Sequence, residues 1–339
     1  MRPKLSVFID RLFQLNFLPY AVTLGIALAI GFILIFFLRR FVVGQTVREE
    51  GPKSHYKKSG TPTLGGIIFV LALNIMAFYP WSDGSSALVI ALARAVLAFS
   101  LVGFIDDVVK LYKNKEGLSV KQKTVGLALL SLYYSYYFLY RSGLEPIFYL
   151  PFKSEALVIT GGWKIVYLIF ATVYIYFIVN AVNLTDGVDG LAGSVSLLVL
   201  LFAAYFANYS YLNPLAHAAL RNVSLLLVAG LLAFLYFNRH PAKIFMGDTG
   251  SLGLGAGIAL IYLYLGKPWL LLFVGIIYIV EALSVLLQVS YFKMTGGKRL
   301  FKMTPIHHHF ELSKWSEKKI VAIFVLVTLI GGLISVLIP

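Results

Sequence analysis

Long apolar segments alternate with short polar loops along the whole chain. A transmembrane helix needs roughly 20 mostly apolar residues, and ten segments meet or approach that length. The pattern therefore predicts an all-α, polytopic integral membrane protein, with residues 1–339 forming a single transmembrane domain. The ten candidate spans are Tyr20–Leu38, Leu64–Tyr79, Ala87–Ile105, Val125–Tyr140, Ile165–Val182, Leu191–Phe206, Leu220–Phe237, Leu252–Leu265, Trp269–Tyr291 and Ile320–Ile338.

Composition supports this class. Hydrophobic residues make up 59% of the chain, where a soluble domain has about half. The absence of cysteine excludes disulfides and thiolate metal sites. The net charge of +14 lies in short loops beside the spans, so anionic lipid, topology and an anionic substrate explain it better than nucleic acid.

The basic residues also predict the topology. Of the 29 Lys and Arg residues, 20 fall in the loops 39–63, 106–124, 183–190, 238–251 and 292–319. The positive-inside rule makes these loops cytoplasmic and both termini periplasmic. No signal peptide is predicted, residues 1–19 are expected to include an interfacial segment, and residues 150–163 predict a small periplasmic hairpin.

Two adjacent carboxylates, Asp106 and Asp107, directly follow the third apolar segment. Such a pair is costly at a membrane surface unless it is solvated, paired or bound to a cation. If the helix continues, Asp106 and Lys110 are four residues apart and can form an ion pair. Asp107 then points about 100° away. We therefore expect one carboxylate to be held and the other to be free to act.

Two further loops of the same face carry aspartates. Asp186 and Asp189 lie in a loop without Lys or Arg, and each is followed by glycine. That pattern fits Asx turns, or else a site for Mg²⁺ or for ligand NH and OH groups. Asp248 lies among Gly, Thr and Ser at the start of the eighth span, where helix N–H groups favour an anion. Helix capping is the alternative interpretation.

Basic residues and histidines surround these aspartates in the same set of loops. His307, His308 and His309 are consecutive, which is a poor arrangement for one zinc ion, so they are interpreted as donors to a phosphate or pyrophosphate. An acidic floor with a basic rim fits a phosphate ester bridged by Mg²⁺. The rim lysines are Lys53, Lys57, Lys58, Lys121 and Lys123.

Some polar residues lie inside the apolar segments. Glu281 and Gln288 are seven residues apart and share a helix face. Charges within a membrane favour a functional role. A structural ion pair between Arg94 and Glu281 is an equally weighted alternative.

Four motifs together resemble the polyprenyl-phosphate N-acetylhexosamine-1-phosphate transferases, over a region from about residue 53 to the end of the chain. The unbroken histidine triplet followed by glutamate is similar to the muramoyl-pentapeptide branch of that family. The motifs are Asp-Asp-x-x-Lys at 106–110, Asn-x-x-Asn-Leu-Thr-Asp-Gly-x-Asp-Gly-Leu at 180–191, Phe-Met-Gly-Asp-x-Gly-Ser at 245–251 and Pro-x-His-His-His-x-Glu at 305–311.

The resemblance implies ten transmembrane helices, the ninth of them broken, a cytoplasm-facing cleft in a bacterial cytoplasmic membrane, and dependence on Mg²⁺. It implies transfer of phospho-MurNAc-pentapeptide from its UDP carrier to undecaprenyl phosphate, which gives lipid I and UMP in peptidoglycan synthesis. It also suggests a homodimer.

The resemblance also implies roles for individual residues. Asp248 matches the Mg²⁺ ligand, Asp106 the base on the lipid phosphate, and Phe245 a ring stacked on uracil. The catalytic set is Asp106, Asp107, Asp248 and His307. Substrate binding is expected from Lys58, Thr63, Gly187, Asp189, Asn238 and Phe245 in the nucleoside pocket, and from Lys123, Asn180, Asn183, Asp186, Gln288, His308 and His309 elsewhere in the cleft.

Three alternatives stay open at this level. An aspartate could act as a nucleophile and form a phospho-enzyme, instead of removing a proton from the acceptor. A GlcNAc-1-phosphate transferase is the nearest rival function, although the intact histidine triplet argues against it. An ion-coupled transporter is the rival from another class, but its site would lie near the bilayer midplane.

Overall fold

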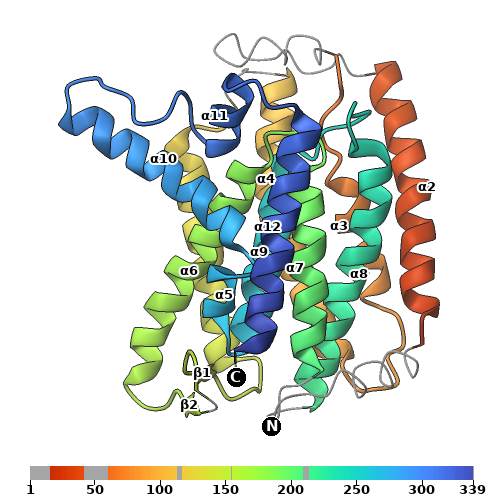
Figure 1. Ribbon diagram of the computed structural model, residues 1–339. Helices are drawn as coiled ribbons and strands as arrows, with labels where there is room; N and C mark the ends of the chain where they lie inside the picture. Colours follow the sequence, from red (N-terminus) through yellow and green to blue (C-terminus); the bar gives the residue numbers. More distant parts are fainter. Residues whose placement is uncertain (1–15, 42–59, 113–116, 154, 209–213, 339) are drawn as a thin grey trace.

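The computed structural model describes residues 16–41, 60–112, 117–153, 155–208 and 214–338. This part of the chain holds eleven α-helices, a short 3₁₀ helix and one two-stranded hairpin (Figure 1). The helices are α2 (Leu18–Phe41), α3 (Ile67–Met76), α4 (Ser86–Tyr112), α5 (Val120–Tyr140), α6 (Trp163–Thr185), α7 (Leu191–Ala207), α8 (Pro214–Asn238), α9 (Gly247–Tyr264), α10 (Ile276–Met294), α11 (Ile306–Leu312) and α12 (Glu317–Leu337).

Each of the ten predicted apolar segments contains helix. Six helices are long and apolar enough to cross a membrane, namely α2, α4, α6, α8, α10 and α12, and α3 and α7 are shorter apolar helices. The protein is therefore a helical, polytopic membrane protein. Ten crossings and periplasmic termini remain predictions. The ninth segment is interrupted as expected, because a 3₁₀ helix, η2 (Pro268–Leu272), precedes α10.

Helix α9 forms the centre of the bundle. Its residues from Thr249 to Leu263 are all buried, and it packs most extensively against α4 and α6. Small residues along α9 allow this close approach. A Cβ atom at Gly255, for example, would lie 2.7 Å from Val179 Cα of α6. The start of α9, with Asp248, is thereby held against the two neighbouring helices.

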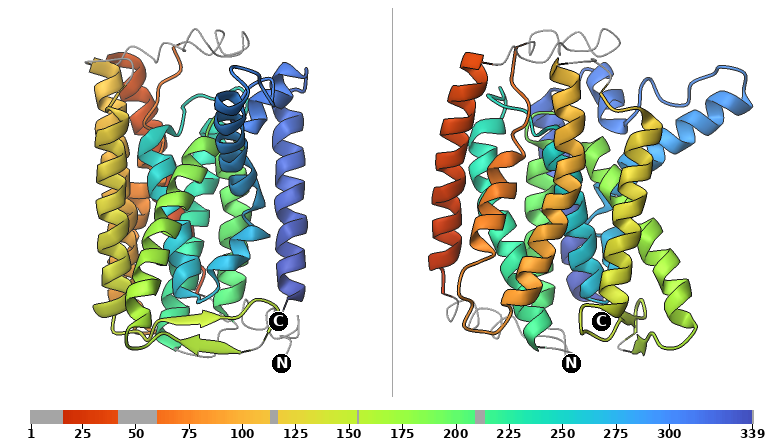
Figure 2. Two further views of the ribbon diagram at one scale, coloured as in Figure 1. Left: turned by 90° about the vertical axis from the view of Figure 1, so that its left-hand side faces the viewer. Right: turned by 180° about the vertical axis from the view of Figure 1, so that it is seen from behind.

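The two ends of the bundle differ. Strands β1 (Ile147–Tyr149) and β2 (Ala156–Val158) pair antiparallel at the end where α2 begins and α12 ends (Figure 1). The hairpin thus exists, but its first strand begins at Ile147, before the predicted range 150–163. Helix α11 and the α8–α9 loop lie at the opposite end, and α10 leans away from the bundle there (Figure 2).

Some predictions concern residues outside the described part of the chain. Most of the expected interfacial segment, residues 1–15, and the loop lysines Lys53, Lys57 and Lys58 belong to this group.

Candidate active site

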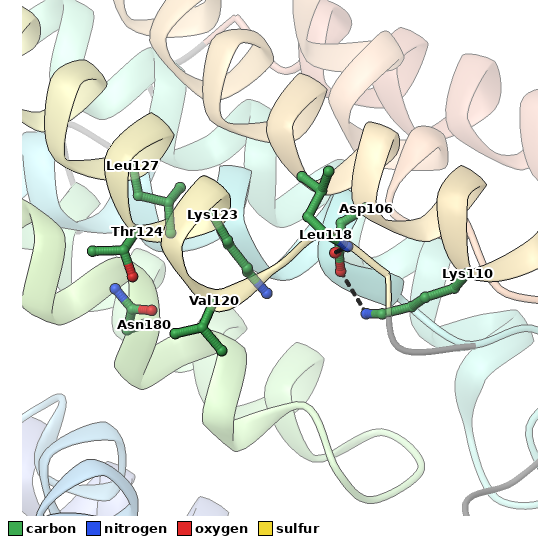
Figure 3. Close-up of a pocket in the computed structure, with 8 residues that line it drawn as sticks. All are labelled: Asp106, Lys110, Leu118, Val120, Lys123, Thr124, Leu127 and Asn180. Carbon is green, nitrogen blue, oxygen red and sulfur yellow. Dashed lines mark hydrogen bonds and ion pairs between the residues drawn. The ribbon is translucent and has the colours of Figure 1, made fainter. Parts of the chain in front are cut away.

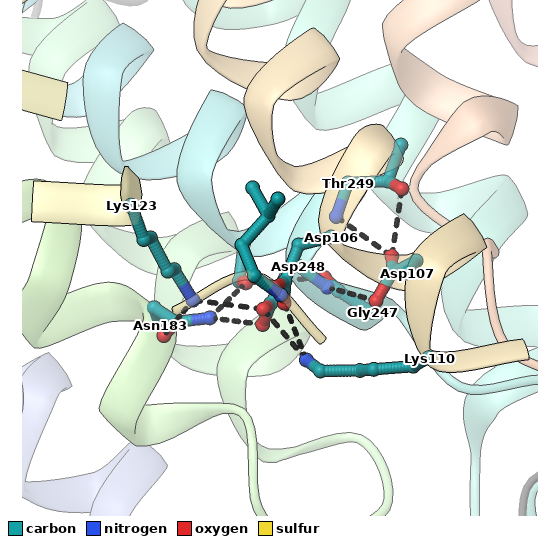
Figure 4. Close-up of polar contacts among 10 residues, drawn as sticks. Asp106, Asp107, Lys110, Lys123, Asn183, Gly247, Asp248 and Thr249 are labelled. Carbon is teal, nitrogen blue, oxygen red and sulfur yellow. Dashed lines mark hydrogen bonds and ion pairs between the residues drawn. The ribbon is translucent and has the colours of Figure 1, made fainter. Parts of the chain in front are cut away.

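Three carboxylates meet where α4 ends and α9 begins (Figure 4). The helix does continue through the Asp pair, so Asp106 Oδ2 and Lys110 Nζ form the predicted ion pair at 2.6 Å. Asp106 Oδ1 also accepts a hydrogen bond from the Leu118 N–H at 2.7 Å. One oxygen each of Asp106, Asp107 and Asp248 lie within 4.8 Å of one another. Two elements that are far apart in sequence thus form one acidic cluster.

Asp107 is not the free carboxylate that the sequence predicted. Its Oδ2 accepts hydrogen bonds from the Thr249 N–H at 2.9 Å and the Thr249 hydroxyl at 2.7 Å. Its Oδ1 accepts a weaker one from the Asp248 N–H at 3.2 Å. Asp107 therefore caps α9 from a neighbouring helix, where the helix dipole favours a negative charge. The anion expected at this helix start is supplied by the protein itself.

Asp248 lies at the centre of the polar contacts. Its Oδ2 binds Lys110 Nζ and Lys123 Nζ, both at 2.8 Å, and its Oδ1 accepts a hydrogen bond from Asn183 Nδ2 at 2.7 Å. Burial raises the pKa of the Asp248 carboxyl, but a hydrogen bond shared with Asp106 and the charges of Lys123 and Lys110 outweigh burial. Its pKa therefore lies well below the ordinary value, and Asp248 is ionised at neutral pH.

The last turns of α6 add Asn180 and Asn183, and the loop between α6 and α7 adds Asp186. Asn183 Nδ2 also donates to Ser251 Oγ at 2.8 Å, so this residue joins α6 to α9. Asn180 bonds back to the Tyr176 carbonyl at 2.7 Å. Asp186 follows the end of α6, where burial, followed by the charges of Asp248 and Asp107, raises the pKa of its carboxyl to about 8.

This raised pKa gives a testable pH dependence. A free aspartate titrates near pH 3.9, so the folded protein holds the Asp186 proton more tightly than the unfolded chain. The stability of the metal-free protein should therefore fall as the pH rises from about 4 to about 8. In Asp186→Asn the side chain stays neutral, so this loss should be smaller. Thermal unfolding in detergent with EDTA at pH 5, 7 and 9 measures it, and equal slopes would contradict the assignment.

Asp189 and Asn238 join the α6–α7 and α8–α9 loops beside the cluster. Asp189 Oδ2 lies 3.2 Å from His240 Nδ1 and accepts the Ala242 N–H at 3.1 Å. Asp189, His240 and Glu317 could hold a metal ion by spacing, although these contacts already connect their segments. Asn238 accepts the Gly190 N–H at 2.9 Å and donates to the Ile244 carbonyl at 2.9 Å. Asn238 thus shapes the loops with both of its polar atoms.

Thr63 and Phe245 lie on adjoining segments before α3 and α9. The Phe245 N–H donates to the Pro62 carbonyl, and the Gly65 N–H donates to the Phe245 carbonyl, both at 2.8 Å. The Phe245 ring is half-buried. Thr63 Oγ1 is buried and has no hydrogen-bond partner in the described part of the chain. A buried hydroxyl without a partner is costly, so Thr63 fits a position that awaits a ligand.

The three histidines point to different partners. His307 Nδ1 lies 3.1 Å from Glu281 Oε2, and His308 Nδ1 lies 2.7 Å from Glu311 Oε2. His309 Nδ1 accepts the Lys302 N–H at 3.1 Å. The His307 ring lies against Gly187, next to Asp186. Glu281 therefore pairs with His307, and the alternative pair with Arg94 is wrong because Arg94 is exposed.

Gln288 does not reach the acidic cluster through its hydrogen bonds. Its Oε1 accepts the Leu300 and Phe301 N–H groups at 3.0 and 2.9 Å. Gln288 and Glu281 thus share a face of α10, as predicted; Gln288 contacts the segment that leads into α11, and Glu281 contacts α11 itself.

A cavity of about 240 Å³ adjoins the cluster between α4, α5 and α6 (Figure 3). Asp106, Lys110 and Lys123 give it a charged end. Leu118, Val120 and Leu127 give it an apolar wall, and Thr124 and Asn180 complete the lining. The cavity can therefore accept a molecule with an anionic group and an apolar part.

The donor atoms of the acidic cluster fit a divalent metal. Carboxylate and amide oxygens are hard ligands of the kind that Mg²⁺ prefers. Asp248 is the central candidate, because Asp106 and Asp107 have oxygens within 4.8 Å of its own and Asn183 is hydrogen-bonded to it.

Sequence reasoning missed two partners of this site. The i,i+4 spacing indicated the bond of Lys110 to Asp106 but not its second bond, to Asp248. Thr249 was seen only as part of a motif, although it binds Asp107 through both its N–H and its hydroxyl. Their position in the motifs at 106–110 and 245–251 was the available signal.

Comparison with known proteins identifies the family of the chain. Residues 88–266 match the model of glycosyl transferase family 4. The chain is 42% identical over 313 residues to the phospho-N-acetylmuramoyl-pentapeptide-transferase of Acetivibrio thermocellus. This alignment covers 92% of this chain and 91% of the relative. It is 45% identical over 321 residues to the enzyme of that name from Caldanaerobacter subterraneus, in an alignment that covers 93% of this chain and 96% of the relative.

Proposed function

The chain belongs to the phospho-N-acetylmuramoyl-pentapeptide-transferases of glycosyl transferase family 4, and from this premise we propose its reaction. The protein transfers phospho-MurNAc-pentapeptide from UDP-MurNAc-pentapeptide to undecaprenyl phosphate. The products are lipid I and UMP, and the step belongs to peptidoglycan synthesis.

The observation that carries the proposal is the convergence of charges on Asp248. Three carboxylates and two lysines from α4, α5 and α9 meet beside one cavity. In this reaction one anion attacks another, so neutralisation of charge is the main task of the site. Basic side chains within reach of the same carboxylate suit that task.

The bond changes are simple. An oxygen of the lipid phosphate attacks the phosphorus that bears the sugar, and the bond from that phosphorus to the UMP oxygen breaks. Asp106 lines the cavity, so its carboxylate is suited to hold or remove the acceptor's proton. The apolar wall suits the hydrocarbon end of the carrier, and Lys123 suits its phosphate.

The contacts of Asp107 argue against this residue as the nucleophile of a phospho-enzyme. Its two oxygens accept three hydrogen bonds from the start of α9. A nucleophile needs an accessible lone pair, and Asp107, unlike Asp106, does not line the cavity. Asp107 is therefore better suited to hold Asp248 in place than to attack a phosphate.

Magnesium would be held by Asp248, with Asp106 and Asp107 close by, and when bound it would supply Lewis-acid stabilisation of the pyrophosphate and the leaving UMP. The half-buried Phe245 ring is suited to stack on uracil, and the Thr63 hydroxyl, which has no partner among the described residues, is suited to bind the nucleoside. We assign Gly187, Asp189 and Asn238 to the loops around that pocket.

The distribution of Lys and Arg indicates on which side of the membrane the site lies. The motif loops belong to the set of alternate loops that carries 20 of the 29 Lys and Arg residues, so we assign them to the cytoplasmic face of a bacterial inner membrane, where the UDP-linked donor is available. A homodimer remains part of the proposal through the family resemblance alone.

The test is UMP release by purified protein in detergent. We expect UMP only when UDP-MurNAc-pentapeptide, undecaprenyl phosphate and Mg²⁺ are all present. UMP released without the lipid acceptor would support the phospho-enzyme route instead. Release with UDP-GlcNAc but not with the muramoyl donor would move the protein to the sister branch. If UMP is released with neither donor, the proposal is overturned.

A further inference from the structure

A buried acid–histidine pair connects α10 to α11 outside the acidic cluster. Glu281 Oε2 lies 3.1 Å from His307 Nδ1. Glu281 is 0% exposed and His307 is 1% exposed. A carboxylate accepts hydrogen bonds and has none to donate, so Nδ1 carries the proton of this bond. The bond thus fixes which ring nitrogen faces Glu281 and which faces away from it.

The other ring nitrogen points at the candidate active site. His307 Nε2 is buried and has no hydrogen-bond partner in the described part of the chain. It lies against Gly187, where the Cβ of any other residue would overlap the imidazole. Gly187 directly follows Asp186 in the α6–α7 loop. The ring therefore enters the site loop at a position that only glycine leaves open.

The charge of Glu281 determines whether His307 Nε2 is a hydrogen-bond donor. Glu281 has no Lys or Arg partner among the described residues, and Glu281 Oε1 makes no hydrogen bond there. A buried carboxylate needs a cationic or hydrogen-bonding partner. A ring that donates from Nδ1 to Glu281 Oε2 and from Nε2 to a ligand is a cationic partner for the carboxylate and leaves neither ring nitrogen without a partner. A phosphate oxygen is the matching acceptor for Nε2–H.

We propose that Glu281 is a positioning residue for His307, and that it aims His307 Nε2 at the diphosphate of the sugar donor. This inference rests on the proposed function. Glu281 itself touches no substrate and acts through the imidazole. Glu281 lies in α10, after the break at Phe273–Gly275. We infer that the interruption of the ninth segment brings its carboxylate into contact with α11.

The experiment is a double-mutant cycle with Glu281→Met and His307→Ala, read as kcat and donor KM for UMP release. Glu281→Met should lower kcat about 10- to 100-fold, as is usual for carboxylates that orient a histidine, with little change in donor KM. In the His307→Ala background, Glu281→Met should cost less than about twofold more. The double variant also leaves no buried carboxylate without its partner.

Two further variants separate positioning from packing. Glu281→Gln keeps an acceptor oxygen for Nδ1–H and should retain more activity than Glu281→Met. Tyr278→Phe removes another buried polar group of α10, whose hydroxyl lies 2.7 Å from Ser196 Oγ. It should lower the melting temperature without changing kcat.

Each outcome decides between the two proposals. Independent losses that multiply in the double variant, or a higher donor KM at unchanged kcat, would overturn the positioning role and leave the proposed function intact. A wild-type protein that releases UMP from neither donor would overturn the proposed function, and the inference would fall with it.

Discussion

Asp248→Asn is expected to abolish UMP release, with a loss of at least about a thousandfold in kcat, equivalent to about 4 kcal/mol of transition-state stabilisation. The substitution keeps the shape and hydrogen-bonding reach of the side chain. It removes the charge that Lys110 and Lys123 both bind at 2.8 Å, and with it the central ligand for a divalent metal. UMP release with both substrates and saturating Mg²⁺ measures the effect.

Asp83→Asn is the matched control. Asp83 accepts a hydrogen bond from Asn222 at 3.0 Å near the start of α4, whereas Asp106 lies near the other end of that helix. The control should keep its activity. Thermal unfolding of both variants checks that they fold. Substantial UMP release by Asp248→Asn would remove this residue from the centre of the reaction.

Gly103→Ala should cause the second-largest loss, although Gly103 has no polar side chain. A Cβ atom there would overlap the Asp248 carbonyl group and lie 2.5 Å from Thr249 N. Backbone atoms cannot rotate away, so α4 and α9 must separate. Overpacking of this kind costs about 1–3 kcal/mol in stability. The separation also breaks the register between Asp107 and the start of α9, so activity should fall at least about tenfold.

Gly126→Ala is the control for the added methyl group. Gly126 lies in α5, and its Cβ would meet only Val102 methyl groups at 3.8 and 3.9 Å, which is ordinary contact. This variant should be as stable as the wild type or slightly more so, because alanine favours helix. Measurements of melting temperature and UMP release on both variants test the idea. Equal behaviour of the two would refute the close approach of α4 and α9.

Local patterns explain what the sequence could predict. The helices in the ten apolar segments could be predicted because each segment is a long run of apolar residues, although the ninth is broken before α10. The Asp106–Lys110 pair could be predicted because both residues lie on one helix face, four residues apart. The break in the ninth segment followed from the family resemblance and is present before α10.

Contacts between distant segments explain what it could not. The capping of α9 by Asp107 joins residues 142 positions apart, so no spacing in the sequence reports it. The same holds for Glu281, whose partner His307 lies on α11, a seven-residue helix in a segment that was predicted as loop. Their position inside apolar segments indicated that Arg94 and Glu281 needed partners. The partner of Glu281 is determined by the packing of α10 against α11, which places His307 beside it.

The two lysines on Asp248 have a consequence for how ligands bind. Lys110 Nζ and Lys123 Nζ both contact the same oxygen, Asp248 Oδ2. A divalent cation that takes this oxygen as a ligand must compete with them, and a displaced ammonium group gains most if a phosphate is there to receive it. Metal and nucleotide are then thermodynamically linked, so each should lower the dissociation constant of the other by the same factor.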